Sequence, residues 1–206
     1  MHVRDHFLFE DENTMVRFEE TRNYWPKLKQ LYLVIHYTAN HSLEKTINLF
    51  KERKSSGNTS AHIIIDKDGT VVQMVRFDRK AWHAGKSQWG QLKSLNHFSI
   101  GIELVNAGWL TKAEDDKWYD WKHNEVPKEE VVVLSHKNNP SGKFKGWQIY
   151  PTKQIDKLID ISLALNEKYE FLDILGHDEI SPGRKFDPGP ALNLVSLRSL
   201  VLGRSE

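Results

Sequence analysis

Short apolar runs alternate with amphipathic stretches along much of the chain. Residues 31–36 form a nearly continuous apolar run, which predicts a buried strand. From Leu43 to about Arg53, apolar residues recur at helical spacing, and Ser42 before them is a good N-cap. A strand followed directly by a helix is typical of an α/β fold.

The same alternation continues towards the C-terminus. Residues 61–66 and 70–75 are β-rich and are joined through an Asp-Gly pair, which predicts a hairpin. Thr152 is expected to cap an amphipathic helix, 173–175 to form a short strand, and 192–202 to form a closing helix. We therefore predict a single-domain α/β fold in which a mixed central β-sheet is flanked by helices.

Residues 98–105 alternate cleanly between apolar and polar positions. Phe98 and every second residue after it point to one face, and Ser99, Gly101 and Glu103 point to the other. Because Ser99 and Gly101 are small, the second face is expected to stay open beside Glu103, as a substrate cleft requires.

Two parts of the chain show a less regular pattern of apolar and polar residues. Residues 1–30 are charged and poorly periodic, so we expect them to form an N-terminal arm packed on a domain of residues 31–206. Residues 107–150 show no clear period, and only a short strand at 131–134 and a surface loop at 138–145 are predicted there.

Composition narrows the classes of function. The 206-residue chain has a formal net charge of +1, which favours neither nucleic acid nor an anionic membrane as a partner. It has no cysteine, so any metal must be bound by His, Asp or Glu. The first thirty residues carry no apolar leader and no later run approaches the ~20 apolar residues of a membrane span. We therefore expect a cytoplasmic protein, or a lysin delivered to the cell wall by another route.

Three residues have the chemistry of a zinc site. His36 and His177 each follow a predicted strand, where open α/β sheets place their ligands, and Asp187 lies in a Pro- and Gly-rich loop ten residues after His177. Two imidazoles and one carboxylate leave a fourth tetrahedral position open, as in catalytic zinc sites. The spacing alone does not distinguish such a site from histidines scattered by chance.

The surrounding sequence is more specific, because several blocks resemble, in order, one family: Ser60-Ala61-His62, Ala81-Trp82-His83-Ala84-Gly85, Ser99-Ile100-Gly101-Ile102-Glu103-Leu104, Gly176-His177-Asp178-Glu179 and Gly183-Arg184-Lys185-Phe186-Asp187-Pro188-Gly189. In these blocks the chain resembles the family of N-acetylmuramoyl-L-alanine amidases. These are zinc amidases, and they are related to phage lysozyme-like amidases and to peptidoglycan recognition proteins. The likeness is to the AmpD-like bacterial branch and covers about residues 30–190.

This resemblance implies a role for each matching residue. His36, His177 and Asp187 match the ligands of a Zn2+ ion at one edge of a substrate groove. Glu103 matches the acid that activates water, and Lys185 matches the lysine that stabilises charge on the substrate oxygen. The implied reaction is hydrolysis of the amide bond between N-acetylmuramic acid and L-alanine in peptidoglycan or muropeptides.

Substrate contacts follow less directly from the sequence. Trp82 and Arg184 are candidates for lining the groove or binding a muropeptide carboxylate, and His83 is a candidate either for substrate contact or for a structural hydrogen bond. Three alternatives stay open: an inactive peptidoglycan-binding module, a protein that regulates a partner through residues 107–150, and a zinc peptidase. The complete set of three candidate ligands favours an enzyme over the first of these.

Overall fold

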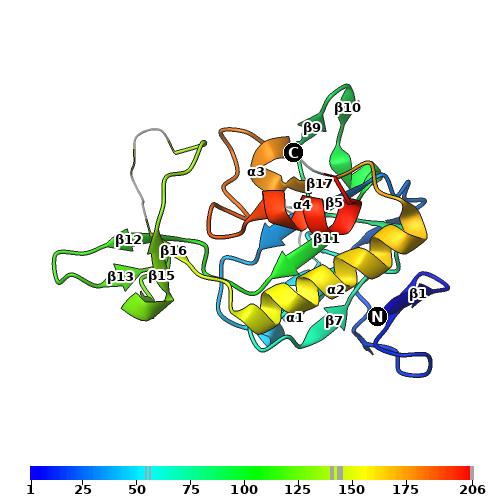
Figure 1. Ribbon diagram of the computed structural model, residues 1–206, viewed down its shortest axis with the longest axis horizontal. Coiled ribbons are helices and arrows are strands. Elements are labelled where there is room, and N and C mark those ends of the chain that lie inside the picture. Colours follow the sequence, from blue (N-terminus) through cyan, green and yellow to red (C-terminus); the bar gives the residue numbers. More distant parts are fainter. Residues whose placement is uncertain (54, 56, 140–141, 143–145, 205–206) are drawn as a thin grey trace.

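A six-stranded mixed sheet forms the centre of the computed structural model, which describes residues 1–53, 55, 57–139, 142 and 146–204 (Figure 1). Its strands, in spatial order, are β17 (Asp173–Gly176), β5 (Tyr32–Tyr37), β11 (Ser99–Leu104), β6 (Ile63–Ile65), β7 (Val71–Gln73) and β3 (Arg17–Phe18). The first four are parallel, β7 runs antiparallel to β6, and β3 runs parallel to β7. The predicted mixed sheet and the β6–β7 hairpin are confirmed.

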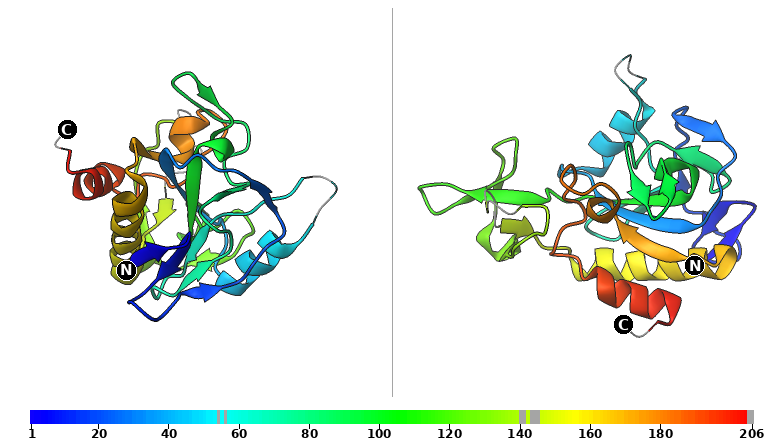
Figure 2. Two further views of the ribbon diagram at one scale, coloured as in Figure 1. Left: turned by 90° about the vertical axis from the view of Figure 1, so that its right-hand side faces the viewer. Right: turned by 90° about the horizontal axis from the view of Figure 1, so that it is seen from above.

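Helices cover both faces of this sheet, as Figure 2 shows from two sides. The helices are α1 (Leu43–Lys51), α2 (Thr152–Tyr169), α3 (His177–Ile180) and α4 (Leu194–Leu202), with short 3-10 turns η1 (Leu95–His97) and η2 (Lys128–Glu130). α2 packs on β6 and α4 packs on α2 and β17 in the main core, whereas α1 packs on Ile64 from the other face. None of the helices in the described residues is long and apolar enough to cross a membrane.

The helix starts agree only partly with the sequence predictions. The Ser42 hydroxyl accepts a hydrogen bond from the Lys45 backbone N–H at 3.2 Å, so this N-cap is confirmed. Thr152 is already inside α2, whose N-cap is Pro151 and makes no side-chain cap bond. The closing helix begins at Leu194, because Asn193 caps it through the Ser196 N–H.

Strand β11 corrects the prediction of an open face. Phe98 precedes the strand and packs in a different cluster from Ile100. The space beside Gly101 is filled by the imidazole of His83, because a Cβ at this position would lie 2.5 Å from the ring. The small residues of this face therefore make room for a histidine rather than for substrate.

Residues 1–30 contribute strands of their own, which the sequence pattern does not predict. They contain β1 (His2–Arg4), β2 (Phe7–Phe9), β3 and β4 (Tyr24–Pro26). β3 forms an edge of the central sheet, and β4 pairs with β8 (Arg79–Ala81). Leu8 is fully buried in the main core, so this segment shares that core.

A second sheet of five antiparallel strands extends to one side of the body (Figure 1). In spatial order its strands are β14 (Glu125–Val126), β13 (Trp118–Tyr119), β12 (Trp109–Lys112), β16 (Gly146–Gln148) and β15 (Val131–Val133). We call it the outer sheet. Only β15 matches a predicted strand, and most of the predicted loop at 138–145 lies outside the described residues.

The outer sheet is attached to the body at both its root and its tip. At the root, Gly108 has a φ of +79°, and a Cβ there would lie 2.4 Å from the ring of Tyr37. At the tip, the Trp121 indole N–H donates to the Ala39 carbonyl at 3.0 Å, and His41 Nε2 lies 2.9 Å from the Asp120 carboxylate. The turn of the β13–β14 hairpin is therefore fixed beside the segment that follows β5.

A small hairpin of β9 (Gln88–Trp89) and β10 (Leu92–Lys93) projects on the side of the body that carries α3 (Figure 1). The segment from β8 to this hairpin carries the Trp-His-Ala-Gly block, which leads to the candidate site.

Candidate metal centre and active site

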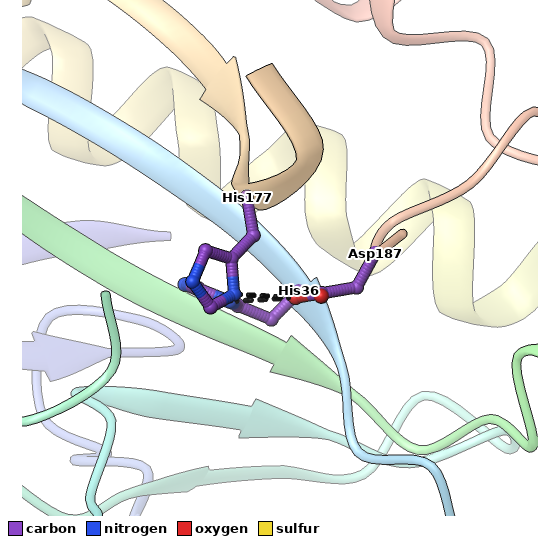
Figure 3. A group of neighbouring side chains, drawn as sticks. All are labelled: His36, His177 and Asp187. Atoms are coloured by element: carbon purple, nitrogen blue, oxygen red, sulfur yellow. Dashed lines mark hydrogen bonds and ion pairs between the residues drawn. The ribbon is translucent and has the colours of Figure 1, made fainter. Parts of the chain in front are cut away.

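His36, His177 and Asp187 converge at the carboxyl ends of the central parallel strands (Figure 3). His36 lies near the end of β5, and His177 directly follows β17, whose last residue is paired with Ile35. Nδ1 of His36 lies 2.9 Å from Nδ1 of His177 and 2.9 Å from Oδ2 of Asp187. Nδ1 of His177 lies 2.8 Å from the same oxygen. The structure thus brings together all three residues proposed as ligands from the sequence.

Burial controls the charges in this cluster. Burial, and next the neighbouring His177, lower the pKa of His36 to about 4, so its imidazole is neutral at physiological pH. Burial alone would raise the pKa of Asp187, but His177 and His36 outweigh it and hold that pKa well below its usual range. The cluster therefore offers a neutral imidazole and a carboxylate, the protonation states that metal ligands require.

The donor set fits a metal ion. The Ala84 carbonyl lies 3.1 Å from Nε2 of His177 and can only accept, so His177 carries its proton on Nε2. Nδ1 is then the nitrogen of this ring that faces the Asp187 carboxylate, at 2.8 Å. A divalent cation bound here would take a lone pair from each of these two atoms. Zinc bonds of about 2.0–2.1 Å would hold tetrahedral ligand atoms about 3.3 Å apart, a shift of about 0.5 Å from the observed spacing.

Glu103 is the group beside this cluster whose hydrogen bonding is incomplete. It is paired in register with His36, is only 9% exposed and lines the same groove. Among the described residues, nothing donates a hydrogen bond to its buried Oε2. Burial, and next the charge of Asp187, raise the pKa of Glu103 to about 8. A carboxyl with this pKa is suited to accept and release a proton near neutral pH.

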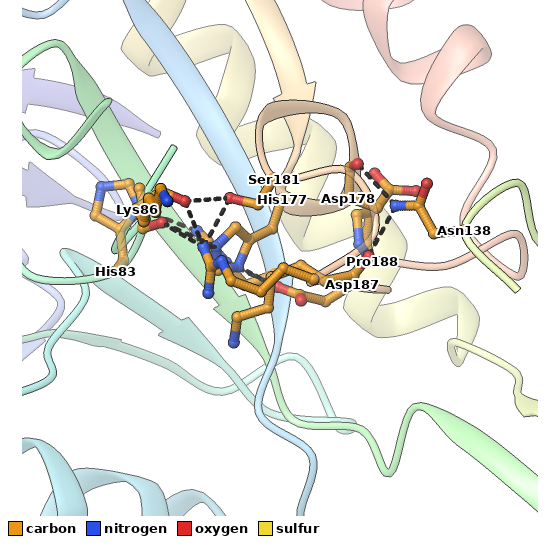
Figure 4. Close-up of polar contacts among 12 residues, drawn as sticks. His83, Lys86, Asn138, His177, Asp178, Ser181, Asp187 and Pro188 are labelled. Carbon is orange, nitrogen blue, oxygen red and sulfur yellow. Dashed lines mark hydrogen bonds and ion pairs between the residues drawn. The ribbon is translucent and has the colours of Figure 1, made fainter. Parts of the chain in front are cut away.

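The loop that carries Asp187 is held from the side of the outer sheet. The Asn138 amide donates to the carbonyls of Asp178 and Lys185, both at 2.9 Å (Figure 4). His136 Nε2 lies 2.9 Å from the Asp178 carboxylate. The sequence predicts an irregular loop from His177, whereas the first four residues form the helical turn α3. Backbone contacts at both ends of this loop fix the Asp187 carboxylate.

A groove of about 490 Å³ opens above the cluster, and its walls come from several parts of the chain. Its lining includes Lys185, Trp82, Trp109, Trp121 and Arg184. In the described part of the chain, the Lys185 ammonium has no ion-pair or hydrogen-bond partner, so its charge is available to a ligand.

Arg184 and His83 are more constrained than their sequence context indicates. Nη2 of Arg184 donates to the carbonyls of Ala84 and Lys86 and to the Ser181 hydroxyl. The other guanidinium nitrogens have no acceptor within the described residues. His83 is 8% exposed, and both of its ring nitrogens contact protein atoms.

His62 is a structural histidine. Its Nδ1 accepts from the Gly101 N–H at 3.0 Å, and its Nε2 therefore donates to the Arg79 carbonyl at 2.8 Å. Burial lowers the pKa of His62 to about 4. With both nitrogens used inside the fold, the ring has no free position for a metal or substrate.

The sequence does not reveal two tryptophans that line the groove, nor the asparagine that fixes the Trp-His-Ala-Gly segment. Trp109 and Trp121 come from the outer sheet, whose short strands carry no clear periodicity. Asn96 fixes the Trp-His-Ala-Gly segment through backbone contacts, which leave no trace in a pattern of side-chain types. The clustering of tryptophans between 109 and 121 is the one signal that could have indicated an aromatic wall.

The fold and the His-His-Asp cluster are shared by one class of proteins, the N-acetylmuramoyl-L-alanine amidases. The chain belongs to this family, whose sequence pattern matches residues 26–190. The resemblance found in the sequence is thereby confirmed. The chain is similar to the 1,6-anhydro-N-acetylmuramyl-L-alanine amidase AmpD of Escherichia coli, with 33% identity over 69% of this chain and 58% of that protein. It is also similar to the N-acetylmuramoyl-L-alanine amidase AmiD of Escherichia coli, with 29% identity over 87% of this chain and 55% of that protein. The chain thus spans less than two thirds of the length of these relatives.

Solved structures show the same fold. A crystal structure of a selenomethionine derivative of AmpD superposes with a TM-score of 0.67 at 25% identity, over 98% of this chain and 99% of that one. A structure of AmiD from Escherichia coli in complex with anhydro-N-acetylmuramic acid-L-Ala-D-γ-Glu-L-Lys has a TM-score of 0.58 at 25% identity, over 92% of this chain and 63% of that one. The predicted α/β fold class is confirmed by these matches.

Proposed function

We propose that this chain is a zinc-dependent hydrolase of the amide bond between N-acetylmuramic acid and L-alanine, acting on peptidoglycan or muropeptides. The observation that carries the proposal is the unpaired Oε2 of Glu103 beside the His36, His177 and Asp187 cluster, in one groove. Family membership and the muropeptide ligand of the related AmiD structure support the substrate class.

Each polar residue of the groove has a task in this reaction. His36, His177 and Asp187 would hold the zinc ion, which when bound would supply Lewis-acid chemistry that polarises the scissile carbonyl and acidifies a water molecule. Glu103 Oε2 takes a proton from the attacking water and returns it to the departing alanine nitrogen. The Lys185 ammonium donates to the substrate oxygen as negative charge develops on it. A C–O bond forms and the C–N bond breaks, leaving a lactyl carboxyl and a free alanine amino group.

The aromatic and basic walls of the groove are assigned to substrate binding. Trp82 presents an indole to the groove, and the free nitrogens of Arg184 can donate hydrogen bonds to a muropeptide carboxylate. A protein that only binds peptidoglycan needs no buried carboxyl with a raised pKa beside three metal-binding side chains. This is why hydrolysis is favoured over the binding-only alternative.

Mass spectrometry of digests tests the proposal. The zinc-loaded protein is incubated with purified murein and, separately, with anhydro-muropeptides. We expect products with a free lactyl carboxyl on muramic acid and a free amino terminus on L-alanine. New amino termini on other residues would indicate a peptidase, and binding without cleavage of either substrate would indicate a recognition module.

A further inference from the structure

We infer that His83 and Ala84, fixed by Asn96, form a platform that sets which ring nitrogen of each candidate histidine ligand faces the metal position. The inference rests on the proposed metal site and concerns positioning residues, which act on His36 and His177 rather than on substrate. We call residues 83 and 84 together with Asn96 the orienting platform.

A chain of hydrogen bonds leads from Ser99 through His83 to His36. The Ser99 carbonyl lies 3.2 Å from Nε2 of His83 and can only accept, so His83 carries its proton on Nε2. The Ser99 hydroxyl, 3.4 Å from the same nitrogen, already donates to the Leu95 carbonyl and also acts as an acceptor towards His83. Nδ1 of the neutral His83 ring therefore has only a lone pair.

That lone pair faces His36. Nδ1 of His83 lies 2.9 Å from Nε2 of His36, so the proton in this contact belongs to His36. With its proton on Nε2, His36 presents a bare Nδ1 to Asp187. The hydrogen bonds from Ser99 through His83 thus select one tautomer of His36.

Ala84, the next residue, orients the second candidate ligand, His177, through its backbone carbonyl. The Ala84 carbonyl lies 3.1 Å from Nε2 of His177 and accepts from it, so Nδ1 is the nitrogen of this ring that faces the candidate metal position (Figure 4). The same carbonyl accepts from Nη2 of Arg184 at 3.1 Å. Two adjacent residues, one through its side chain and one through its backbone, therefore orient both rings.

The platform itself is rigid. Oδ1 of the buried Asn96 accepts from the backbone N–H of His83 at 3.1 Å and of Ala84 at 2.7 Å. Gly101 provides the space for the His83 ring, since a side chain there would overlap it. His83 and Ala84 therefore cannot turn away from the two ligands without breaking buried hydrogen bonds.

The consequence is that Nδ1 of His36, Nδ1 of His177 and Oδ2 of Asp187 face one another within 2.9 Å. A divalent ion at this position would meet both rings through Nδ1, and neither ring would have to turn. Partners that fix the tautomer of a metal-ligating histidine typically contribute about 10–100-fold to metal affinity.

Zinc affinity, measured on the metal-stripped full chain by competition with a chelator, tests the role of His83. We expect His83→Ala to weaken zinc binding by about 10–100-fold. His83→Asn keeps an acceptor oxygen near the position of Nδ1 and is expected to recover most of the affinity. His62→Gln is the matched control, because His62 is equally buried but contacts neither ligand, and it is expected to bind zinc like the wild type.

A measurement on the unaltered protein removes any dependence on how the variants fold. Nitrogen NMR of the metal-free imidazole rings is expected to show His36 and His177 protonated on Nε2 and bare on Nδ1. A proton on Nδ1 of either ring, or wild-type zinc affinity in His83→Ala, would overturn the inference. A wild type that shows these tautomers and binds zinc but cleaves no muropeptide would contradict the proposed function alone, and would support the platform.

Discussion

Glu103 lies directly opposite His36 on the neighbouring parallel strand, so both side chains leave the same face of the sheet. Adjacent strands are about 4.8 Å apart, and the separation between the candidate base and the candidate ligand is therefore set by backbone hydrogen bonds. A loop-borne base would depend on loop conformation, whereas this pair keeps its geometry as long as β5 and β11 stay in register.

Glu103→Gln is expected to lose about 10²–10⁴-fold in turnover, because the amide keeps the shape of the side chain but cannot accept a proton. Zinc content and the thermal unfolding midpoint are expected to stay near those of the wild type. Steady-state kinetics on a muropeptide together with elemental analysis checks both parts. Near-normal turnover in this variant would mean that another group acts as the base.

Asp187→Ala is expected to lose most of the bound zinc, while the wild type carries one ion per chain. Asp120→Asn is a suitable control, because Asp120 is also buried and pairs with a histidine but lies in the outer sheet. Elemental analysis after gel filtration measures the metal in each protein. Full occupancy in Asp187→Ala, or equal losses in both variants, would contradict the assignment of this ligand.

Lys185→Ala is expected to reduce kcat much more than it raises KM, because the charge that the ammonium meets develops only in the transition state. Its zinc content should be unchanged, since the backbone carbonyl rather than the side chain of Lys185 holds the loop through Asn138. A rise in KM with unchanged kcat would instead make Lys185 a substrate-binding residue.

Trp121→Ala is expected to raise KM with little change in kcat. The indole is 51% exposed, lines the groove and is oriented by its hydrogen bond to Ala39. Trp25→Ala removes an even more exposed indole outside the groove lining and serves as the control. Kinetics of both variants are compared on one muropeptide, and equal KM values would show that Trp121 takes no part in substrate binding.

His62 is expected to make stability depend on pH. Its pKa falls from 6.5 in the unfolded chain to about 4 in the fold, so the unfolded state binds a proton first as pH falls. The stabilisation is complete above pH 6.5 and is lost towards pH 4, by about 3 kcal/mol for this single group. In urea unfolding, the free-energy difference between wild type and His62→Gln should therefore shrink between pH 7 and 4.5. Parallel pH curves for the two proteins would contradict the buried neutral ring.

The central fold was predictable because its signals are local. The apolar run before His36, the cap at Ser42 and the Asp-Gly turn each depend on neighbouring residues, and all three are confirmed. Apart from β15, the outer sheet was not predictable, since its strands of two to four residues are too short to show alternation. Strand β3 was missed for the same reason, although it completes the edge of the central sheet.

The candidate site, like the fold, was predicted only in part from the sequence. The family motifs indicated His36, His177, Asp187 and Glu103, and the structure brings these side chains together. The interpretation of Gly101 as open space was wrong, because a sequence pattern shows which face a residue occupies but not which distant ring fills that face.

His36 and Asp187 are 151 residues apart in the chain, and yet they face one candidate metal position. An unfolded chain cannot hold ligands so distant at bonding distance, so a zinc ion at this position would bind the native state almost exclusively. Ligand-linked stability then follows RT ln(1 + [L]/Kd), which is about 2.7 kcal/mol when free zinc is 100 times Kd. Zinc supply is therefore expected to govern how long the folded protein survives heat and proteases, independently of any catalysis it performs.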